Sequence, residues 1–542
     1  MEVRFLGAVG VVTGSCTWMR DQSRGWSFLI DCGISFEGER VTHWSDGEWP
    51  FDPASIQFVA LTHAHMDHCG LLPMLYKKGF KGRVRCTEET AAMAKLVLEG
   101  AAQQEGCLYS IGDVAKIIWQ PFKSDVALGQ PRPVDTDLFL QPYRSGHIIG
   151  AVSLAVLWGP RGPRQRSIVF SGDVGPGSEG AEVAPVIRFP WRPNTANYAV
   201  LESTYGHLVR SPEQRDPETR LATLKGLVER TVAQQGVLLL PAFALGRVQD
   251  LLFDLHTVVA SDPALYDKLQ IVLDAPMAER LHPTITKALG DSDVTRKAGK
   301  VRLRWLGKQV FKLLGLDDAD LDDIDAAISV CEQAFRMKRG DTVSPIVRGN
   351  ELARNWRPLA QSVDELGLGR NVQPQGPMVI VCSSADGGSG NAAQWLPTLL
   401  IDSRSIIAST GYTAGDSVMT RVMEVANIDL KERRRHTGYV AWNSGEKIKV
   451  RDIAADLVRL TGYSAHADQQ ELVNWVFHER DGKRVKIAPN VFLQHGEDPQ
   501  RVLLANALEN KAKECGDCIT VIRPQRNHDA WICLENDVLP SS

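Results

Sequence analysis

Three histidines and an aspartate crowd into six consecutive residues of this 542-residue chain. They form the segment His63-Ala64-His65-Met66-Asp67-His68, directly after the apolar run 56–62. Side chains at i and i+2 of an extended segment point the same way, so His63 and His65 can bind one metal ion. The turn that follows can bring Asp67 and His68 to a second ion about 3.5–4 Å away, as in two-metal hydrolases. Imidazole nitrogens and carboxylate oxygens suit zinc, so the segment predicts a dinuclear metal site.

Further residues of metal-binding type lie downstream in similar settings. His147 stands among glycines, and Asp173 lies in a turn directly after an apolar run. Glu202 ends another apolar run, where an unpaired carboxylate is costly, so we expect it to contact a metal, a histidine or backbone amides. His466 and His495 also occupy strand-end segments rich in glycine or acidic residues. Each residue alone is as often ordinary structure, but together they can complete a two-metal site.

The composition is that of an ordinary globular protein, with 44% apolar and 23% charged residues. The length favours two domains. The sequence has no apolar run near the roughly 20 residues of a membrane span, and a strand predicted from residue 2 leaves no room for a signal peptide. Ten cysteines are scattered, and the single C-x-x-C pair, Cys515 and Cys518, has no second pair at zinc-finger spacing. We expect free thiols in the cytoplasm and no membrane partner.

The net charge of −4 does not indicate a broad nucleic-acid-binding face. A confined cleft can still be positive on an acidic protein. Two basic stretches are more often solvated faces than phosphate contacts. They comprise Arg296, Lys297, Lys300, Arg302, Arg304, Lys308 and Lys312 in the first, and residues 431–435 in the second.

The elements that must position these residues change in type along the chain. Residues 1–208 alternate short apolar runs with glycine and aspartate turns, and Ala91–Glu99 has a helical pattern. Strands are predicted over 3–5, 26–30, 56–61, 153–157 and 167–170. Strand ends in this part carry polar residues, including Asp31, which is where chemistry is usually found.

Residues 209–455 instead show the α/β alternation of parallel βαβ units. The patterns predict a helix over 213–234 and strands over 237–240, 270–273, 378–382 and 405–408. Residues 290–375 are helical and charged, and we interpret them as an elaboration of this second domain. Residues 456–542 return to strands and turns. We therefore predict that the second domain is inserted into the first.

Over nearly its whole length the chain resembles the β-CASP branch of the metallo-β-lactamase-fold nucleases. The H-x-H-x-D-H motif lies at 63–68, the single-histidine motif at His147 and the bridging aspartate at Asp173. The branch-specific motifs match at Glu202, His466 and His495, with supporting similarity at 241–247 and 411–415. The resemblance implies an αββα sandwich with an inserted α/β domain of parallel-sheet type. It implies kinship with RNA-cleaving members, including the nuclease subunit of messenger-RNA cleavage and polyadenylation.

The resemblance also implies roles for individual residues and two Zn²⁺ ions, with Mn²⁺ as a substitute. The ligands would be His63, His65 and His147 for the first ion, Asp67, His68 and His495 for the second, with Asp173 shared. Asp31 would support the metal-bearing loops. The catalytic residues would be Asp67, Asp173, Glu202 and His466, with His466 as a general acid oriented by Glu202. Substrate would contact Arg247, Ser383, Ser384, Gly411 and Ser464.

Three other interpretations compete with a ribonuclease acting on single-stranded RNA. A small-molecule metallo-hydrolase of the same fold would not need Glu202, His466, His495 and a large second domain. A non-catalytic scaffold would have lost ligands that are all present here. A DNA nuclease is disfavoured because the DNA-acting branch typically carries an aliphatic residue in place of His495. The loop 382–390 departs from the family pattern through Asp386, although its glycines suit a phosphate path. The sequence does not decide between endonuclease and exonuclease action, and a homodimer rests on analogy with prokaryotic relatives.

Overall fold

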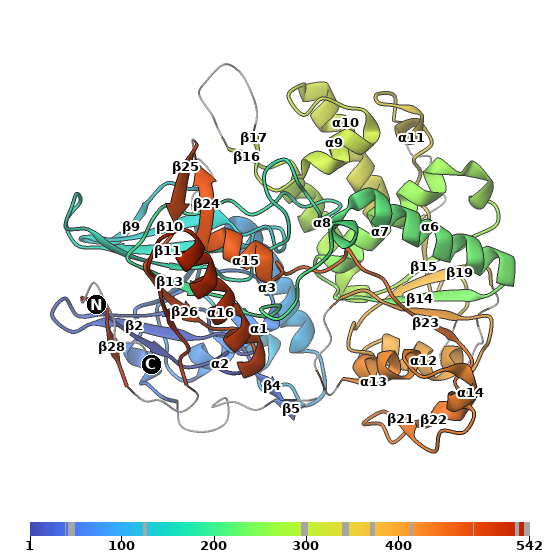
Figure 1. Ribbon diagram of the computed structural model, residues 1–542, viewed down its shortest axis with the longest axis horizontal. Helices are drawn as coiled ribbons and strands as arrows, with labels where there is room; N and C mark the ends of the chain where they lie inside the picture. Colours follow the sequence, from blue (N-terminus) through green and yellow to red (C-terminus); the bar gives the residue numbers. More distant parts are fainter. Residues whose placement is uncertain are drawn as a thin grey trace.

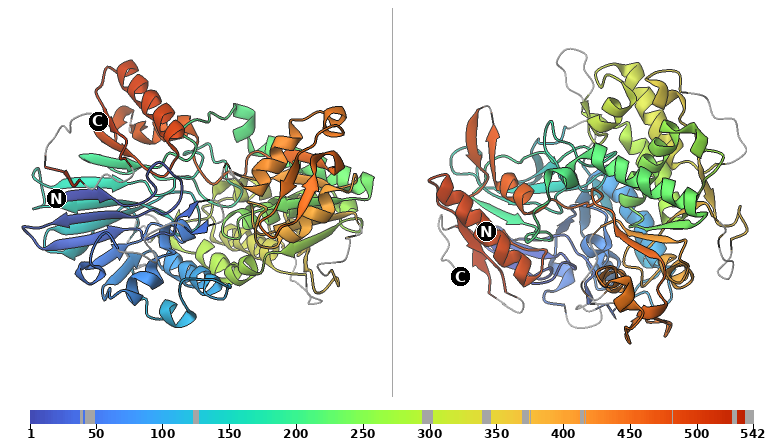
Figure 2. Two further views of the ribbon diagram at one scale, coloured as in Figure 1. Left: turned by 90° about the horizontal axis from the view of Figure 1, so that it is seen from below. Right: turned by 45° about the vertical axis from the view of Figure 1, so that its right-hand side comes forward.

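The computed structural model describes residues 1–37, 40–41, 49–122, 127–293, 302–338, 346–368, 374, 376–411, 415, 417–480, 482–525 and 530–535. The chain forms two units that lie side by side, and both termini belong to the same unit (Figure 1). The turned views separate the same two units, with the C-terminal helix α16 (Asp498–Glu514) on the outside of the first (Figure 2).

The described part of the first unit is a sandwich of two stacked sheets. The first sheet has the order β28 (Ile532–Cys533), β1 (Glu2–Phe5), β2 (Thr17–Asp21), β3 (Trp26–Ile30), β6 (Phe58–Ala60), β7 (Arg83–Cys86) and β8 (Trp119–Pro121). The second has the order β27 (Thr520–Ile522), β26 (Asn490–Leu493), β13 (Tyr198–Leu201), β12 (Arg166–Phe170), β11 (Val152–Trp158), β10 (Leu138–Arg144) and β9 (Arg132–Asp135). The C-terminal segment therefore returns to pair with strands from the first 208 residues.

Alternating burial along the strands explains why helices cover both outer faces of this sandwich. Phe28 of β3 and Phe170 of β12 lie in the core between the sheets, where Phe28 stacks on Phe58 at 4.6 Å. Their strand neighbours Leu29 and Val169 point outward, as the strand period requires. Leu29 packs into the core under α2 (Leu72–Lys77), and Val169 packs into the core under α15 (Gln469–Val476) and α16. The predicted αββα sandwich is confirmed.

The second unit is built on a parallel sheet. Its order is β18 (Ala360–Ser362), β15 (Gln270–Asp274), β19 (Met378–Cys382), β14 (Val237–Pro241), β20 (Ile406–Ser409) and β23 (Asp456–Arg459). Every pairing is parallel. One face is covered by α6 (Pro217–Gln234) and α7 (Arg247–Ser261), the other by α12 (Ala392–Leu400) and α13 (Val418–Ala426). The β14 and β19 strands are buried throughout, as expected of a sheet covered on both faces.

The structure refines several predicted boundaries. The predicted helix over 213–234 is interrupted at Asp216, between α5 (Pro212–Arg215) and α6. The Asp216 carboxylate accepts a hydrogen bond from the Thr219 amide, and Pro217 occupies the first helical position, so α6 begins there. Strand β23 pairs with β20 and lies beyond residue 455, so the second sheet extends past the predicted boundary. The division of the chain into domains stays a prediction.

The segment 290–375 is only partly helical where it is described, because it also contains the short strands β16 (Ser292–Asp293) and β17 (Arg302–Leu303) and the edge strand β18. It contains α9 (Lys308–Leu314), α10 (Leu321–Phe335) and α11 (Glu351–Arg354). Nearby, α3 (Glu88–Ala101) of the sandwich packs against α8 (Pro276–Leu289) of the second unit, and Arg280 forms an ion pair with Glu99 at 3.5 Å. Within the described ranges, no helix has both the length and the apolar character needed to cross a bilayer.

Candidate metal centre

The H-x-H-x-D-H segment lies where strand β6 of the sandwich runs into a short helix. His63 and His65 follow the end of β6, and α1 (Met66–Cys69) carries Asp67 and His68. Gly33 allows this turn to approach the end of β3, because a Cβ atom there would lie 1.7 Å from the Asp67 carbonyl oxygen. The strand end, the turn and the first helical turn therefore project their donors from one compact piece of backbone.

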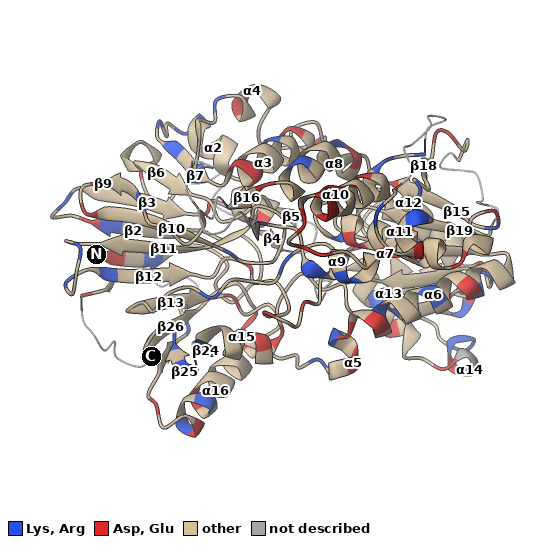
Figure 3. Cartoon of the chain, turned by 90° about the horizontal axis from the view of Figure 1, so that it is seen from above, with Lys and Arg blue, Asp and Glu red and all other residues tan. Residues whose placement is uncertain are grey.

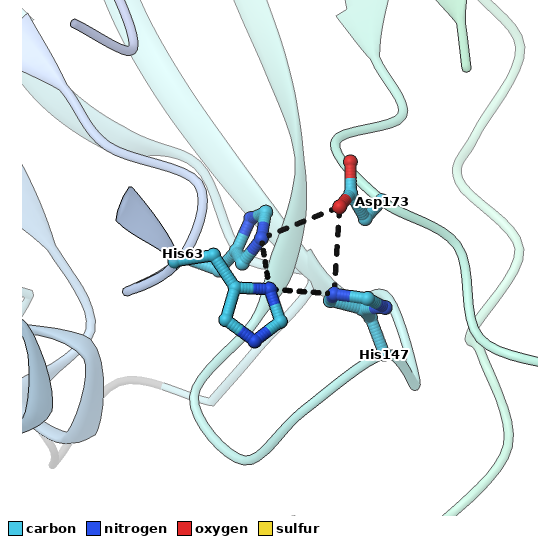
Figure 4. A group of neighbouring side chains, drawn as sticks. His63, His147 and Asp173 are labelled. Atoms are coloured by element: carbon cyan, nitrogen blue, oxygen red, sulfur yellow. Dashed lines mark hydrogen bonds and ion pairs between the residues drawn. The ribbon is translucent and has the colours of Figure 1, made fainter. Parts of the chain in front are cut away.

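The predicted ligands come together as two adjoining groups. One comprises His63, His65, His147 and Asp173, and the other comprises Asp67, His68 and His495; the donor atoms within each group lie within 4.8 Å of one another. His63, His147 and Asp173 point toward one another (Figure 4).

Asp173 faces both groups. Its Oδ2 is 3.4 Å from Nε2 of His63 and 3.4 Å from Nε2 of His147. Its Oδ1 is 3.2 Å from Nε2 of His68 and 3.5 Å from Nε2 of His495. One carboxylate thus contacts two clusters of nitrogen atoms, as a ligand shared by two ions would.

Hydrogen bonds at the outer ring nitrogens determine which nitrogen faces the first group. His147 Nδ1 is 3.0 Å from the Ala465 carbonyl oxygen, and His65 Nε2 is 3.4 Å from that of Leu245. A carbonyl oxygen only accepts, so these nitrogens carry the protons and donate. The opposite nitrogens, His147 Nε2 and His65 Nδ1, are then unprotonated although they lie 3.0 Å apart. Two lone pairs at that distance repel each other unless a cation lies between them, so the donor set fits a divalent metal.

The second group is oriented in the same way. Asp31 Oδ2 is 2.7 Å from His68 Nδ1, and Thr204 Oγ1 is 3.0 Å from His495 Nδ1. The Nε2 atoms of His68 and His495 then face each other at 3.1 Å. Asp31 and His495 both adopt positive φ, 59° and 55°, a region that non-glycine residues rarely occupy. Backbone strain of this kind persists only where the surrounding structure maintains it, and it clusters at functional sites.

Burial and charge set the protonation of these groups. Burial lowers the pKa of His63 and His147 and brings that of His65 to about 3, which leaves these imidazoles neutral as metal ligation requires. Burial alone would raise the pKa of Asp173, but the histidines around it outweigh burial and hold it well below its usual value. His68 differs: burial lowers its pKa, yet Asp173 and Asp31 raise it by more, so a metal bound there must displace a proton.

Beside the two groups, Glu202 holds His466. The Glu202 carboxylate follows β13 and accepts hydrogen bonds from the Val174 amide at 2.7 Å and the Thr204 amide at 3.3 Å. Both of its oxygens are 3.1 Å from His466 Nδ1. The other ring nitrogen, Nε2, is 3.9 Å from Asp173 Oδ2, and the His466 side chain is 15% exposed. The ring thus contacts a carboxylate on one side and reaches both the metal-binding groups and solvent on the other.

The residues predicted to contact substrate do not all lie at the metal centre, and not all of them are accessible to a substrate. Arg247 is buried; it donates to the Tyr463 carbonyl oxygen at 2.9 Å and pairs with Asp250 at 2.7 Å, so its guanidinium contacts the protein interior. Ser464 adjoins His466 and accepts a hydrogen bond from its amide at 3.2 Å. The other three lie just beyond the carboxyl ends of β19 and β20, on either side of β14: Ser383, Ser384 and Gly411.

The two basic stretches form no single positive surface among the described residues. Residues 294–301 and the side chain of Arg302 lie outside that part, and Lys308 pairs with Asp318 at 3.1 Å. In the second stretch Arg433 is buried and donates to the Val425 and Ile428 carbonyl oxygens, where it caps the end of α13. Acidic and basic residues are interspersed along helices such as α8 and α16 (Figure 3).

Known families match both ends of the chain. Residues 9–220 match the metallo-beta-lactamase superfamily, and residues 451–521 match the Zn-dependent metallo-hydrolase RNA specificity domain. The chain belongs to the β-CASP branch of the metallo-β-lactamase superfamily. It is therefore a metal-dependent hydrolase.

Relatives of this family cover most of the chain. Ribonuclease TTHA0252 of Thermus thermophilus is 26% identical over 95% of this chain and 97% of its own length. Transcription termination factor FttA of Methanothermobacter thermautotrophicus is 24% identical over 93% of this chain and 68% of its own length. Cleavage and polyadenylation specificity factor subunit 3-I of Arabidopsis thaliana is 31% identical over 58% of this chain and 43% of its own length.

Proposed function

We propose that this chain is a zinc-dependent ribonuclease that hydrolyses phosphodiester bonds of single-stranded RNA in the cytoplasm. The observation that carries the proposal is a proton donor beside a two-ion donor set: His466 lies between Glu202 and Asp173, and Asp173 faces both groups of ligands. RNA is favoured over DNA by the names of the similar proteins, a ribonuclease and a cleavage and polyadenylation factor subunit, and by His495. The RNA specificity domain matched by residues 451–521 points the same way.

Two zinc ions would be held by the two groups, with His63, His65 and His147 for one, Asp67, His68 and His495 for the other, and Asp173 shared. When bound, zinc would supply hydroxide near neutral pH and would neutralise charge that builds on the phosphoryl oxygens. Mn²⁺ would substitute because the same ligand types accept it.

His466 acts as the general acid in this proposal. Burial alone lowers the pKa of His466, but the Glu202 carboxylate raises it by more, which favours the protonated ring that a general acid needs. Glu202 accepts from Nδ1 and leaves Nε2 to give its proton to the departing oxygen as the P–O bond breaks. That oxygen keeps the bonding electron pair and leaves as a hydroxyl group.

An exposed aromatic ring supports a single-stranded substrate. Phe243 is 47% exposed and lies two residues before Leu245, whose carbonyl oxygen contacts His65. An unpaired base can stack on such a ring, whereas a base inside a duplex cannot.

The decisive experiment incubates the full chain with a labelled single-stranded RNA and the matching DNA, each with and without a chelator. We expect cleavage of RNA that the chelator abolishes and that added Zn²⁺ restores. Cleavage of DNA alone would make the protein a DNA nuclease of the same fold. Hydrolysis of small esters with neither nucleic acid cleaved would indicate a small-molecule hydrolase and overturn the proposal.

A further inference from the structure

The loop that carries His466 is attached to the second unit by a buried group of charged side chains. Strand β23 of the second sheet ends at Arg459, and the chain then runs through Gly462 and Tyr463 to His466 at the metal centre. Gly462 has φ +90°, and a Cβ atom there would lie 2.9 Å from the Arg220 side chain of α6. The loop therefore passes directly against the second unit before it reaches the site.

Both ends of Tyr463 are held by residues of α6 and α7. Its hydroxyl group donates to Asp254 Oδ2 at 2.7 Å, and Arg220 Nε donates to the same oxygen at 2.7 Å. Its carbonyl oxygen accepts from Arg247 Nη1 at 2.9 Å, and Arg247 in turn pairs with Asp250 at 2.7 Å.

These residues are buried to a degree that is costly for charged groups. Tyr463 and Asp250 are 0% exposed, Asp254 is 1%, Arg247 is 3% and Arg220 is 4%. Charges out of contact with water are stable only when paired, and here two arginines meet two aspartates. Such a network fixes the backbone between them more firmly than apolar packing does, because each hydrogen bond is directional.

The far end of the loop is fixed as well. Both terminal nitrogens of Arg210 donate to the His466 carbonyl oxygen at 3.1 Å, and the Arg210 amide donates to Asp468 at 2.9 Å. The backbone of the loop is therefore held by Arg210 at His466 itself and by the contacts of Tyr463 three residues earlier.

We infer that Tyr463 and Arg247 are positioning residues for His466. The buried network of α6 and α7 in the second unit thus orients the proton donor at the metal centre of the first unit. This inference rests on the proposed function of His466. It assigns Arg247 to the proton donor's loop rather than to the substrate. The chemical step is the one proposed above: the proton moves from His466 Nε2 to the leaving oxygen, which takes the electron pair of the broken P–O bond.

The test compares two substrates with different leaving groups, because only a poor leaving group needs a proton from His466. The leaving oxygen of RNA is a basic alkoxide, whereas bis(p-nitrophenyl) phosphate releases p-nitrophenolate, which leaves without a proton. Tyr463→Phe removes one hydrogen bond and leaves all four charges paired. We expect it to lower kcat on RNA about tenfold or more, with a much smaller fall on the nitrophenyl ester. KM for RNA should change less than about twofold, because ground-state binding is untouched.

The matched control is Tyr198→Phe, which removes a buried hydroxyl donated to the Leu534 carbonyl oxygen at 2.8 Å in the sandwich. It should leave the ratio of the two rates as in the wild type. A merely structural role of Tyr463 would lower both rates by the same factor, or neither, and would overturn the inference.

A double-mutant cycle gives an independent readout. If Tyr463 acts through His466, Tyr463→Phe should slow RNA cleavage no further in the His466→Ala background. A further tenfold loss there would overturn the inference. A wild-type protein that cleaves DNA and not RNA would refute the proposed substrate alone, and the same ratios would then be read on DNA.

Discussion

At the scale of single residues, the two nitrogens of each imidazole have separate tasks. The outer nitrogens of His65 and His147 donate to carbonyl oxygens, and that of His68 contacts a carboxylate, so the inner nitrogens are directed into the two ligand groups. Outer contacts of this kind raise ligand basicity and fix ring orientation. His466 shares the pattern but faces the edge of the groups, which separates a proton donor from the metal ligands.

The role of His466 predicts a selective loss of turnover. His466→Ala should bind metal and RNA as the wild type does, because the seven residues of the two ligand groups are untouched. Cleavage should fall roughly 10²–10⁴-fold, the usual contribution of a general acid. Single-turnover cleavage, metal analysis and RNA binding on the same preparation would check this. His436→Ala, which changes an exposed histidine of the second unit, is the control. Wild-type cleavage by the His466 variant would rule out the acid role.

The exposed ring of Phe243 predicts an effect on binding rather than on chemistry. Phe243→Ala should weaken RNA binding by about 1–3 kcal/mol, the usual contribution of one stacked base, and Phe243→Tyr should retain it. Filter binding or fluorescence anisotropy with a short single-stranded RNA would measure the change. Equal affinity of the alanine variant and the wild type would show that no base stacks there.

At the scale of elements, α7 is joined to the segment before the edge strand β18 of the second sheet through a neutral histidine. His256 Nδ1 is 2.6 Å from the Leu252 carbonyl oxygen, so Nδ1 donates, and Nε2 accepts from the Leu359 amide at 3.1 Å just before β18. Protonation of Nε2 would remove this acceptor. Burial lowers the pKa of His256 to about 4.

That shift predicts a dependence of stability on pH. Between about pH 6.5 and pH 4 the unfolded chain binds a proton at His256 that the folded chain does not, so the free energy of unfolding falls as the pH falls. The contribution is complete above pH 6.5, and about 3 kcal/mol is lost by pH 4. His256→Gln keeps an acceptor but does not titrate. The free energy of unfolding of this variant, relative to that of the wild type, should therefore rise as the pH falls from 6.5 to 4.

Urea unfolding of both proteins at several pH values would measure that difference. The comparison cancels the titration of the other histidines, which are common to both proteins. A constant difference from pH 7.5 to pH 4.5 would contradict the prediction.

At the scale of the whole molecule, the site is assembled from distant parts of the chain. The ligands come from residues 63–68, 147 and 173 of the first segment and from 495 after the second unit, while Leu245 of the second unit contacts His65. Bound metal should therefore stabilise the sandwich by joining its N-terminal and C-terminal segments. At a hundredfold excess over Kd each site should contribute about 3 kcal/mol.

Metal removal tests this directly. Chelation should lower the Tm of the first unit, and added Zn²⁺ should restore it, because a ligand that binds only the folded state stabilises that state. Calorimetry with Asp173→Ala as the control would show the transition, since a variant without the shared ligand should respond far less. An unchanged Tm of the wild type after verified metal loss would contradict the prediction.

The sequence by itself determined the fold class and the identity of the clustered residues. Regular spacing of donors in 63–68 and apolar runs before Asp173 and Glu202 are local features, and a strand end positions its side chains by local geometry. The break of the predicted helix at Asp216 also has a local cause, an aspartate followed by a proline, although the apolar periodicity alone did not indicate it.

Only the tertiary structure decided how these groups are held. The carbonyl oxygens of Leu245 and Ala465 orient two ligands, and every residue type carries a carbonyl, so no sequence signal marks them. The family resemblance implied that Arg247 contacts substrate, but its burial against Asp250 and Tyr463 depends on long-range packing that the resemblance does not describe. Local patterns specify strands and side-chain chemistry, whereas the partners of a buried charge are set by long-range packing.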